Sequence, residues 1–359
     1  MLLLFFENHK KCLSLFFSWR GCVGSQSIRE DVKQSTMLKF EPILKSLIWG
    51  GEKLVPYKEL TADCHAVGES WDLSGIAGEE SVVAEGPDRG MHLAALVERD
   101  GAALVGRANY ARFGNEFPLL VKFIDAREDL SVQVHPNDQL ARACHNAHGK
   151  SEMWYVLRGS DEGAHLRLGF SRSVTPEEYE QAVEQGTIQE LVAEYPIREG
   201  DLFHIPAGRI HTICAGAMLL EIQQPSTLTY RIYDYGRTDS NGRPRELHTE
   251  LAKKALDFTV QESYRMAYEQ AEDKAVRLVT SEHFTTDLLK LTQPYTLELA
   301  ALDSFVALIC TDGRGVLRDD RGQELPIHQG ETVLIPASTQ CVEILPESEK
   351  MTLLTSWIE

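Results

Sequence analysis

The sequence lacks the features that mark several large classes of protein. None of its apolar runs reaches the roughly 18 residues that a membrane-spanning helix needs, so we expect no membrane partner. Positive charge is in deficit, because 36 Lys and Arg stand against 54 Asp and Glu, which gives a net charge of −18. Nucleic acids and anionic lipid surfaces attract basic proteins, so this balance argues against both as partners. A small anionic substrate stays compatible with it, since a few cations gathered in a cleft can override the net charge.

Paired cysteines are also missing. The seven cysteines have no Cys-x-x-Cys spacing and are spread along the 359 residues, at Cys12, Cys22, Cys64, Cys144, Cys214, Cys310 and Cys341. An odd, dispersed set predicts free thiols in a reducing compartment, so we expect a cytoplasmic protein. The length suffices for two or three domains, and the 43% hydrophobic and 25% charged residues are ordinary for a globular chain.

The first 36 residues differ in composition from the rest of the chain. Their apolar runs, MLLLFF and CLSLFFSW, are short and are interrupted or followed by charged residues. A secretory signal has its basic residues first and then an unbroken apolar stretch, which is not the order here. Met37 opens a sequence that reads as the start of a folded domain. We therefore expect residues 1–36 to be a non-native or disordered extension from an upstream start codon, with a weak signal peptide as the alternative.

Strand signals dominate the remaining chain. Short β-branched or aromatic runs bounded by Gly, Pro, Asn or Asp predict strands at 82–83, 102–105, 119–124, 131–135, 153–157 and 164–169. Helical patterns cover 138–147, 175–184, 187–194 and 245–258. Thr175 and Glu178 have the spacing of a capping box, with Pro176 in the first turn. The segment of about 171–196 is therefore expected to be a small helical insert beside a β barrel.

Four residues have the chemistry and the spacing of metal ligands. Gln133 and His135 are two residues apart in a strand pattern, so their side chains share one face. Glu152 opens a second strand-like run, and His211 follows an Ile-Pro-Ala-Gly turn. Two His, one Glu and one Gln suit zinc or another divalent first-row metal. Because no thiolate is among them, an open catalytic site that keeps a water is more plausible than a closed structural site.

An internal repeat predicts the fold. Residues 199–211 align without gaps on residues 329–341, and each copy has Gly and an acid, then an apolar strand, then Ile-Pro-Ala. This pattern is typical of the cupin double-sheet jelly roll. We therefore expect a mainly β chain of two cupin-type double-sheet jelly-roll barrels, with a catalytic domain at 37–270 and a second domain at 271–359. The second copy carries Cys341 where the first carries His211, so the second barrel is expected to lack metal ligands.

Three motifs give the chain a resemblance to type I mannose-6-phosphate isomerase, in its short bacterial form. They are Gln133-x-His135-Pro136, the run GKSEMWY at 149–155, and Pro206-Ala207-Gly208-x-x-His211, with shorter matches at 47–51, 68–72 and 224–237. The resemblance covers the chain from about residue 37 to its end. It implies one zinc ion per chain, or another divalent metal, held by Gln133, His135, Glu152 and His211. Ser151 and Asp72 stand where Thr and Glu are commoner, and neither is a ligand position.

Charged residues inside apolar strand patterns supply the other candidates. Lys122 and Glu221 each interrupt an apolar run, and Arg231 lies in a strand-like run after Glu221. A charged side chain is rarely buried without a partner, so we expect these groups to face a cavity. By resemblance, Arg231 is expected to be catalytic, and basic residues at the matching lysine positions are expected to bind substrate. Lys122, as a charge inside an apolar strand, is also expected to serve the reaction and is counted as catalytic. Lys150 and Glu221 are expected at the substrate, Glu221 by orienting the cations, and the residues do not decide which group is the proton-transfer base.

The resemblance implies a zinc-dependent aldose–ketose isomerase that interconverts mannose 6-phosphate and fructose 6-phosphate through an enediol. A metal near the carbonyl suits this chemistry, and cations would stabilise the enediolate and bind the phosphate. The expected partner is thus a small phosphorylated sugar, and the oligomeric state does not follow from the residues. Two alternatives stay open: an isomerase of another sugar, and a metal-binding cupin that senses or stores a sugar without turnover.

Overall fold

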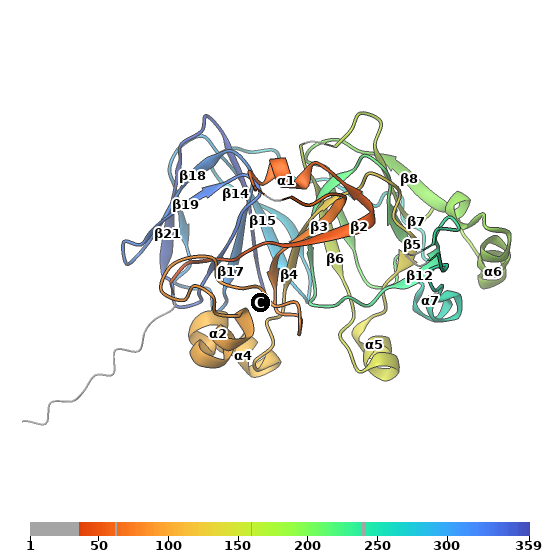
Figure 1. Ribbon diagram of the computed structural model, residues 1–359, viewed down its shortest axis with the longest axis horizontal. Coiled ribbons are helices and arrows are strands. Elements are labelled where there is room, and N and C mark those ends of the chain that lie inside the picture. Colours follow the sequence, from red (N-terminus) through yellow and green to blue (C-terminus); the bar gives the residue numbers. More distant parts are fainter. Residues whose placement is uncertain (1–35, 62, 159, 239–241) are drawn as a thin grey trace, which may run out of the picture. The chain divides into compact units, whose positions relative to one another are not determined.

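Strands are the main regular structure of the described chain. The computed structural model describes residues 36–61, 63–158, 160–238 and 242–359 (Figure 1). The prediction made for residues 1–36 lies outside these residues, apart from Thr36. None of the helices in the described part is both long and apolar enough to cross a lipid bilayer.

Two antiparallel sheets make up the first barrel. In the described residues the larger sheet has the order β13-β9-β6-β11-β4-β3-β2 and the smaller sheet the order β12-β5-β10-β7-β8. The strands of the larger sheet are β2 (Ile43–Gly51), β3 (Val67–Ser74), β4 (Leu120–Asp125), β6 (Glu152–Val156), β9 (Leu202–Ile205), β11 (Met218–Gln223) and β13 (Arg265–Met266). Those of the smaller sheet are β5 (Val132–Val134), β7 (His165–Phe170), β8 (Val192–Pro196), β10 (His211–Ile213) and β12 (Tyr230–Tyr233).

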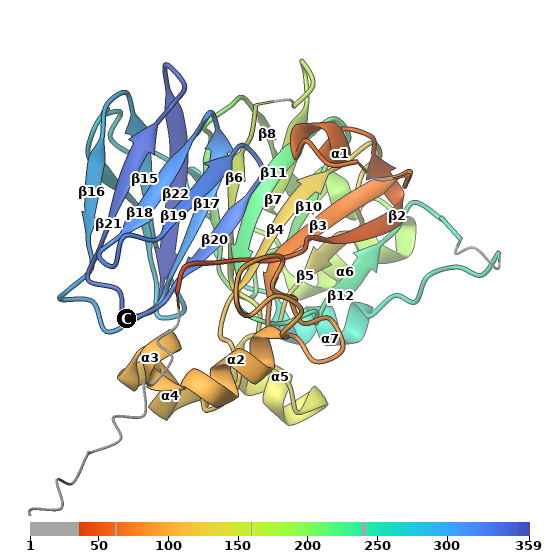
Figure 2. The same cartoon turned by 60° about the vertical axis from the view of Figure 1, so that its left-hand side comes forward.

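The second barrel repeats this plan. Its larger sheet has the order β1-β20-β17-β22-β15-β14 and its smaller sheet the order β16-β21-β18-β19 (Figure 2). The strands are β1 (Leu38–Lys39), β14 (Ala275–Thr280), β15 (Thr285–Leu291), β16 (Tyr295–Glu298), β17 (Val306–Asp312), β18 (Arg314–Asp319), β19 (Glu324–His328), β20 (Thr332–Ile335), β21 (Cys341–Pro346) and β22 (Met351–Trp357). The predicted fold class of a mainly β chain with cupin-type barrels is confirmed.

The sequence repeat corresponds to equivalent strands. β9 and β20 occupy the same positions within residues 199–211 and 329–341, and β10 and β21 begin at the last aligned residue of each copy. β1, however, pairs with β20, although it lies at the start of the predicted catalytic domain. The described residues belong to one compact unit, so the division between residues 270 and 271 stays a prediction.

Strand alternation decides which side chains face the first barrel's interior. Val121 and Phe123 of β4 belong to a core that also contains Leu288 and Leu354 of the second barrel, so the two larger sheets pack against each other. Ile124, from the other face of β4, belongs to the core inside the first barrel. Since side chains alternate along a strand, Lys122 shares the inward face with Ile124. A sheet covered on both faces explains why its strands read as nearly continuous apolar runs.

Short helices connect the strands, and several differ from the expectation. The α-helices described are α1 (Leu54–Tyr57), α2 (Leu93–Asp100), α3 (Ala102–Val105), α4 (Arg107–Phe113), α5 (Asp138–His145), α6 (Pro176–Gln185) and α7 (Thr249–Ala255), and a 3-10 helix spans Ile188–Leu191. The capping box of Thr175 and Glu178 at the start of α6 is confirmed. The strand predicted at 102–105 is wrong, because this run forms α3 between Gly101 and Gly106. Four apolar residues cannot distinguish a strand from one helical turn.

The helical insert is shorter than predicted. The helix predicted at 187–194 is limited to the 3-10 helix, and residues 192–196 form β8, which pairs with β7 at the edge of the smaller sheet. The helix predicted at 245–258 is limited to α7. Residues 82–83 make only isolated bridges, whereas α2 and α4 were not anticipated.

Candidate metal centre and active site

Strand pairing brings the predicted site residues together inside the first barrel. On the smaller sheet, Gln133 of β5 lies directly opposite His211 of β10 on one side and Arg231 of β12 on the other. On the larger sheet, Glu221 of β11 lies opposite Lys122 of β4. Side chains directly opposite each other on antiparallel strands lie within contact distance. The candidate residues therefore form two rows, one on each sheet.

Two glycine-containing turns hold together the segments that carry His135, Lys150 and His211. Gly208, in the Pro-Ala-Gly turn, has φ +92° and donates its N–H to the carbonyl of His135 at 2.8 Å. Only glycine adopts such a backbone conformation readily, which explains this residue before β10. A Cβ at Gly149 would lie 2.5 Å from the backbone nitrogen of Asp138, so the chain before β6 packs tightly against the end of β5. This close approach places Lys150 beside His135.

Three of the predicted ligands form a buried cluster. Ligand atoms of His135, Glu152 and His211 all lie within 4.8 Å of one another, and no second group of this kind occurs among the residues the structure describes. His211 Nε2 is 3.4 Å and His135 Nε2 3.6 Å from the carboxylate oxygens of Glu152. Gln133 joins the cluster through its Nε2, which lies 3.2 Å from His211 Nε2.

Backbone carbonyls fix the tautomer of both imidazoles. His135 Nδ1 lies 2.9 Å from the carbonyl of Leu228, and His211 Nδ1 lies 2.8 Å from that of Arg209. A carbonyl only accepts, so each Nδ1 must carry the proton and each Nε2 presents a lone pair to the cluster. This is the arrangement that orients imidazole as a metal ligand.

Charge and burial leave the cluster incomplete without a further partner. Burial lowers the pKa of His211 to about 4 and that of His135 well below its usual range, so both are neutral at pH 7. Within the described residues, the buried His135 Nε2 and Glu152 Oε1 have no hydrogen-bond partner. Unsatisfied buried polar atoms are rare and costly, and a metal ion would satisfy both. The two histidines therefore fit a divalent metal by protonation, and all four residues fit it by donor type and position.

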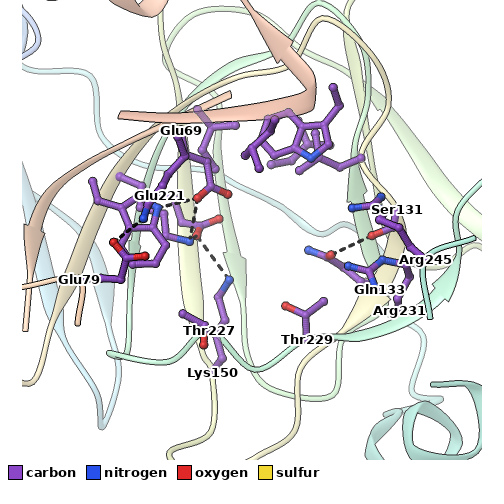
Figure 3. Close-up of a pocket in the computed structure, with 18 residues that line it drawn as sticks. Glu69, Glu79, Ser131, Gln133, Lys150, Glu221, Thr227, Thr229, Arg231 and Arg245 are labelled. Carbon is purple, nitrogen blue, oxygen red and sulfur yellow. Dashed lines mark hydrogen bonds and ion pairs between the residues drawn. The ribbon is translucent and has the colours of Figure 1, made fainter. Parts of the chain in front are cut away.

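The cluster adjoins a cavity of about 320 Å³ between the two sheets (Figure 3). It is lined by Lys45, Leu47, Trp49, Glu69, Trp71, Glu79, Lys122, Ile124, Leu130, Ser131, Gln133, Lys150, Ile213, Glu221, Thr227, Thr229, Arg231 and Arg245. Figure 3 shows Glu69 and Glu221 on one side, and Gln133, Arg231 and Arg245 on the opposite side. Five of the lining residues are Lys or Arg and three are Glu, so the lining is net positive although the whole chain is acidic.

Lys122, Lys150 and Glu221 form one ion-pair network on the larger sheet. Glu221 Oε1 lies 3.2 Å from Lys122 Nζ and 3.5 Å from Lys150 Nζ, and its Oε2 accepts from Trp154 Nε1 at 2.9 Å. Although burial acts to raise it, the charges of Lys150 and Lys122 hold the pKa of Glu221 at about 2. Burial likewise opposes ionisation of Lys150, but the charges of Glu152 and Glu221 outweigh it and raise the pKa of Lys150. Both groups stay ionised at neutral pH.

Arg231 is less constrained than these lysines. Its Nη1 donates to the carbonyl of Glu246 at 3.0 Å, while its Nε has no hydrogen-bond partner among the described residues. Among the residues that the structure describes, no carboxylate lies within ion-pair distance of the Arg231 guanidinium. The neighbouring Arg245 is instead held by Asp234, which its Nε contacts at 2.6 Å. A half-buried guanidinium with spare donors thus lines the cavity.

The structure brings all eight predicted site residues into one region and adds several that the sequence analysis missed. Arg245 follows β12 on an irregular segment, and no periodicity marks it. Glu69 and Trp71 did carry a signal, because they repeat the two-residue spacing of Gln133 and His135 on β3. Trp71 Nε1 donates to Glu69 at 2.6 Å, and Glu69 lies 3.8 Å from Lys122 Nζ.

The fold and the site define a cupin with a candidate metal centre in its first barrel. The family model described as phosphomannose isomerase type I, catalytic domain, matches residues 37–155. The model described as mannose-6-phosphate isomerase, cupin domain, matches residues 274–353.

Individual relatives agree with these matches. Mannose-6-phosphate isomerase ManA of Bacillus subtilis is 33% identical over 302 residues, which is 83% of this chain and 92% of the relative. Mannose-6-phosphate isomerase of Streptococcus mutans is 33% identical over 268 residues, or 74% of this chain and 83% of the relative. The crystal structure of the mannose 6-phosphate isomerase from Bacillus subtilis has a TM-score of 0.80 at 29% identity, covering 90% of this chain and 99% of that one. The chain belongs to the type I mannose-6-phosphate isomerase family, and the predictions of this family and of an isomerase are confirmed.

Proposed function

We propose that this protein is a zinc-dependent isomerase that interconverts mannose 6-phosphate and fructose 6-phosphate through an enediol. The observation that carries the proposal is the buried His135–Glu152–His211 cluster beside a cavity with Lys122 and Arg231 on opposite walls. The relatives from Bacillus subtilis and Streptococcus mutans bear the name of this activity, which supports the choice of substrate. The net positive lining supports a phosphorylated sugar.

Gln133, His135, Glu152 and His211 would hold the metal. Their nitrogen and oxygen donors favour zinc, and three protein ligands with a fourth nearby suit a catalytic site. The Gln133 side chain presents Nε2 to His211, so a half-turn of its terminal amide would offer Oε1 to the ion. When bound, the ion would act as a Lewis acid toward the oxygens of the sugar.

The reaction sets clear demands on the other side chains. The proton on C2 of the aldose leaves and O1 gains a proton, which gives the enediol; O2 then loses its proton and C1 gains one, which gives the ketose. Negative charge develops on O1 and O2 along this path, and cations placed there lower the barrier. Lys122 and Arg231, on opposite walls of the cavity, would supply that charge.

Lys150 and Glu221 would serve binding and positioning. Lys150 is held protonated by Glu152 and Glu221, so it would bind an anionic or hydroxyl oxygen and would not accept a proton. Glu221 contacts both ammonium groups and the indole N–H, and it would keep the two lysines directed at the substrate.

We also propose that the protein works in the cytoplasm. All five cysteines within the described residues are free thiols, at Cys64, Cys144, Cys214, Cys310 and Cys341. Free thiols are typical of a reducing compartment, which supports the proposal.

A coupled assay tests the proposed activity. Fructose 6-phosphate formed from mannose 6-phosphate is converted through glucose 6-phosphate to an NADPH signal, before and after chelation and after zinc is returned. We expect activity that chelation abolishes and zinc restores. His211→Ala should be inactive, whereas His165→Ala, whose side chain lies outside the cavity lining, is the matched control. Faster turnover of another sugar phosphate would show that the substrate is wrong, and metal-dependent sugar binding without turnover would indicate a sensor.

A further inference from the structure

The second barrel contains a cavity of its own. Its volume is about 400 Å³, within the range of small-molecule sites. The lining includes Arg277 of β14, Asp287 of β15, Leu297 of β16, Val306 of β17, and Thr355 and Trp357 of β22. The strands of both sheets contribute to it, so it lies inside the barrel as the first cavity does.

Strand pairing shows that the two cavities are equivalent. In the first barrel Glu221 pairs with Trp154 on one side and with Lys122 on the other. In the second barrel Thr355 pairs in the same way with Leu308 and Asp287. Thr355 therefore takes the place of Glu221, and Asp287 that of Lys122. Both of these second-barrel residues line the second cavity.

The interior positions equivalent to the proposed ligands are apolar in the second barrel, whereas Cys341, which the repeat aligns with His211, pairs with Glu298. Glu152 pairs with Ile205, and its counterpart Val306 pairs with Ile335, the aligned residue of the repeat. Gln133 pairs with His211, and on the interior face of the second barrel Leu297 pairs with Val342. Leu299, two residues after Leu297, takes the place of His135. This supports the prediction that the second barrel lacks metal ligands.

Polar groups of the lining come from both sheets: Arg277, Asp287 and Thr355 from the larger sheet, and Thr296 and Glu298 of β16 from the smaller one. Arg277 Nε is ion-paired with Asp287, so their charges cancel. Thr355 is only 2% exposed, and its hydroxyl makes no hydrogen bond among the described residues, although it lines the cavity. The hydroxyl can donate and accept, so it offers a hydrogen bond to a ligand in the cavity. The opposite wall offers Leu297, Leu299 and Leu302 with the ring of Tyr295, whereas the ring of Trp357 lies on the same strand as Thr355.

We propose that this second cavity is a binding site for a small uncharged aromatic molecule that bears one hydroxyl or amide group. The ring would pack on the leucines and against Trp357, and the polar group would bond to Thr355 and the adjoining Arg277–Asp287 pair. A phosphorylated sugar is disfavoured here, because the lining has one cation, Arg277, against two carboxylates, Asp287 and Glu298, and so lacks the excess cations of the first cavity. The inference does not depend on the activity proposed for the first barrel.

Binding of simple probes to the whole protein tests this site. 4-Methylphenol, benzyl alcohol and indole would be examined by saturation-transfer NMR and calorimetry, with benzoate and mannose 6-phosphate as anionic probes. We expect at least one uncharged probe to bind with a Kd of about 1 mM or below. Benzoate should bind at least tenfold more weakly, because its carboxylate would lie near Asp287 without a cation to pair with it.

Three variants locate the binding. Thr355→Val keeps the shape and removes the hydroxyl, so it should weaken binding about tenfold, the typical effect of one lost hydrogen bond. Leu302→Trp, which fills the cavity from a half-buried position, should abolish binding. Thr352→Val is the matched control on the opposite face of β22 and should leave the Kd unchanged. The proposal is overturned if no uncharged probe binds, if benzoate binds as well, or if folded Thr355→Val and Leu302→Trp proteins both bind like the wild type.

Discussion

Replacing Arg231 by alanine separates a catalytic role from a structural one. Arg231 makes one side-chain hydrogen bond, from Nη1 to the carbonyl of Glu246 at 3.0 Å, and its Nε has no partner in the described part of the chain. Losing one such bond costs about 1 kcal/mol net, so the free energy of unfolding should fall by about that amount. If the guanidinium stabilises the enediolate, its loss should cost about 2.7–4 kcal/mol in the transition state, or roughly 10²–10³-fold in kcat.

The assay is steady-state kinetics on mannose 6-phosphate, with metal content and denaturant unfolding measured for the same samples. We expect kcat to fall while metal content stays at the wild-type level, since within the described residues the Arg231 side chain donates to the carbonyl of Glu246 and makes no hydrogen bond to a proposed ligand. Arg231→Lys should recover part of kcat, because it restores the charge without the planar fork of donors.

Arg237→Ala is the matched control. Arg237 comes from the same segment but lies outside the cavity lining, and its Nη2 is paired with Asp234 at 2.6 Å. It should lower stability more than Arg231→Ala and change kcat little. A near-normal kcat/KM for Arg231→Ala, or a loss of activity that merely follows unfolding, would refute the catalytic assignment.

Three further predictions address the metal, the pH dependence and the N-terminus. His135→Ala with His211→Ala should purify with no bound divalent metal by elemental analysis, and metal retained by this double variant would show that the ligands are misassigned. Burial lowers the pKa of His204 to about 4 from 6.5, so the unfolded chain takes up this proton first as the pH falls. Stability should therefore be lost between pH 6.5 and 4, by about 2 kcal/mol, and His204→Gln should flatten this part of the unfolding curve; an unchanged curve would contradict it. A protein that begins at Met37 should keep the activity and thermal stability of the full chain, and a large loss of either would show that residues 1–36 are required.

The clustering of the candidate ligands was predictable because strand geometry is regular. The two-residue spacing of Gln133 and His135 placed both on one face, and the Pro-Ala-Gly turn marked the start of the strand that carries His211. Charged residues within apolar strands were equally informative, since Lys122 and Glu221 both face the first cavity. In each case the alternation of side chains along a strand predicted which way the side chain points.

Contacts that depend on irregular segments were not predictable. Arg245 reaches the cavity from a segment without a repeating pattern, where it is held by Asp234. The run at Ala102–Val105 is too short for its composition to select strand over helix. The positions of such residues depend on tertiary packing, which the local sequence pattern does not predict.

The sequence repeat predicted the equivalent strand of the second barrel but not which of its residues faces the interior. The sequence aligns Cys341 with His211, but Cys341 is only half-buried, and its neighbour Val342 belongs to the core inside the second barrel. A shift of one residue moves a side chain to the other face of a strand. The alignment therefore identified the equivalent strand, but only the structure identifies the residue that faces the interior.

Metal titration of the metal-free protein tests the central claim most directly. Zinc would be added in steps to chelated protein while bound metal and turnover of mannose 6-phosphate are both recorded. The account predicts that activity rises in proportion to bound zinc and stops at one ion per chain, because the single buried His–Glu–His cluster among the described residues lies in the first barrel. Turnover that persists without metal, or that requires a second equivalent, would contradict it.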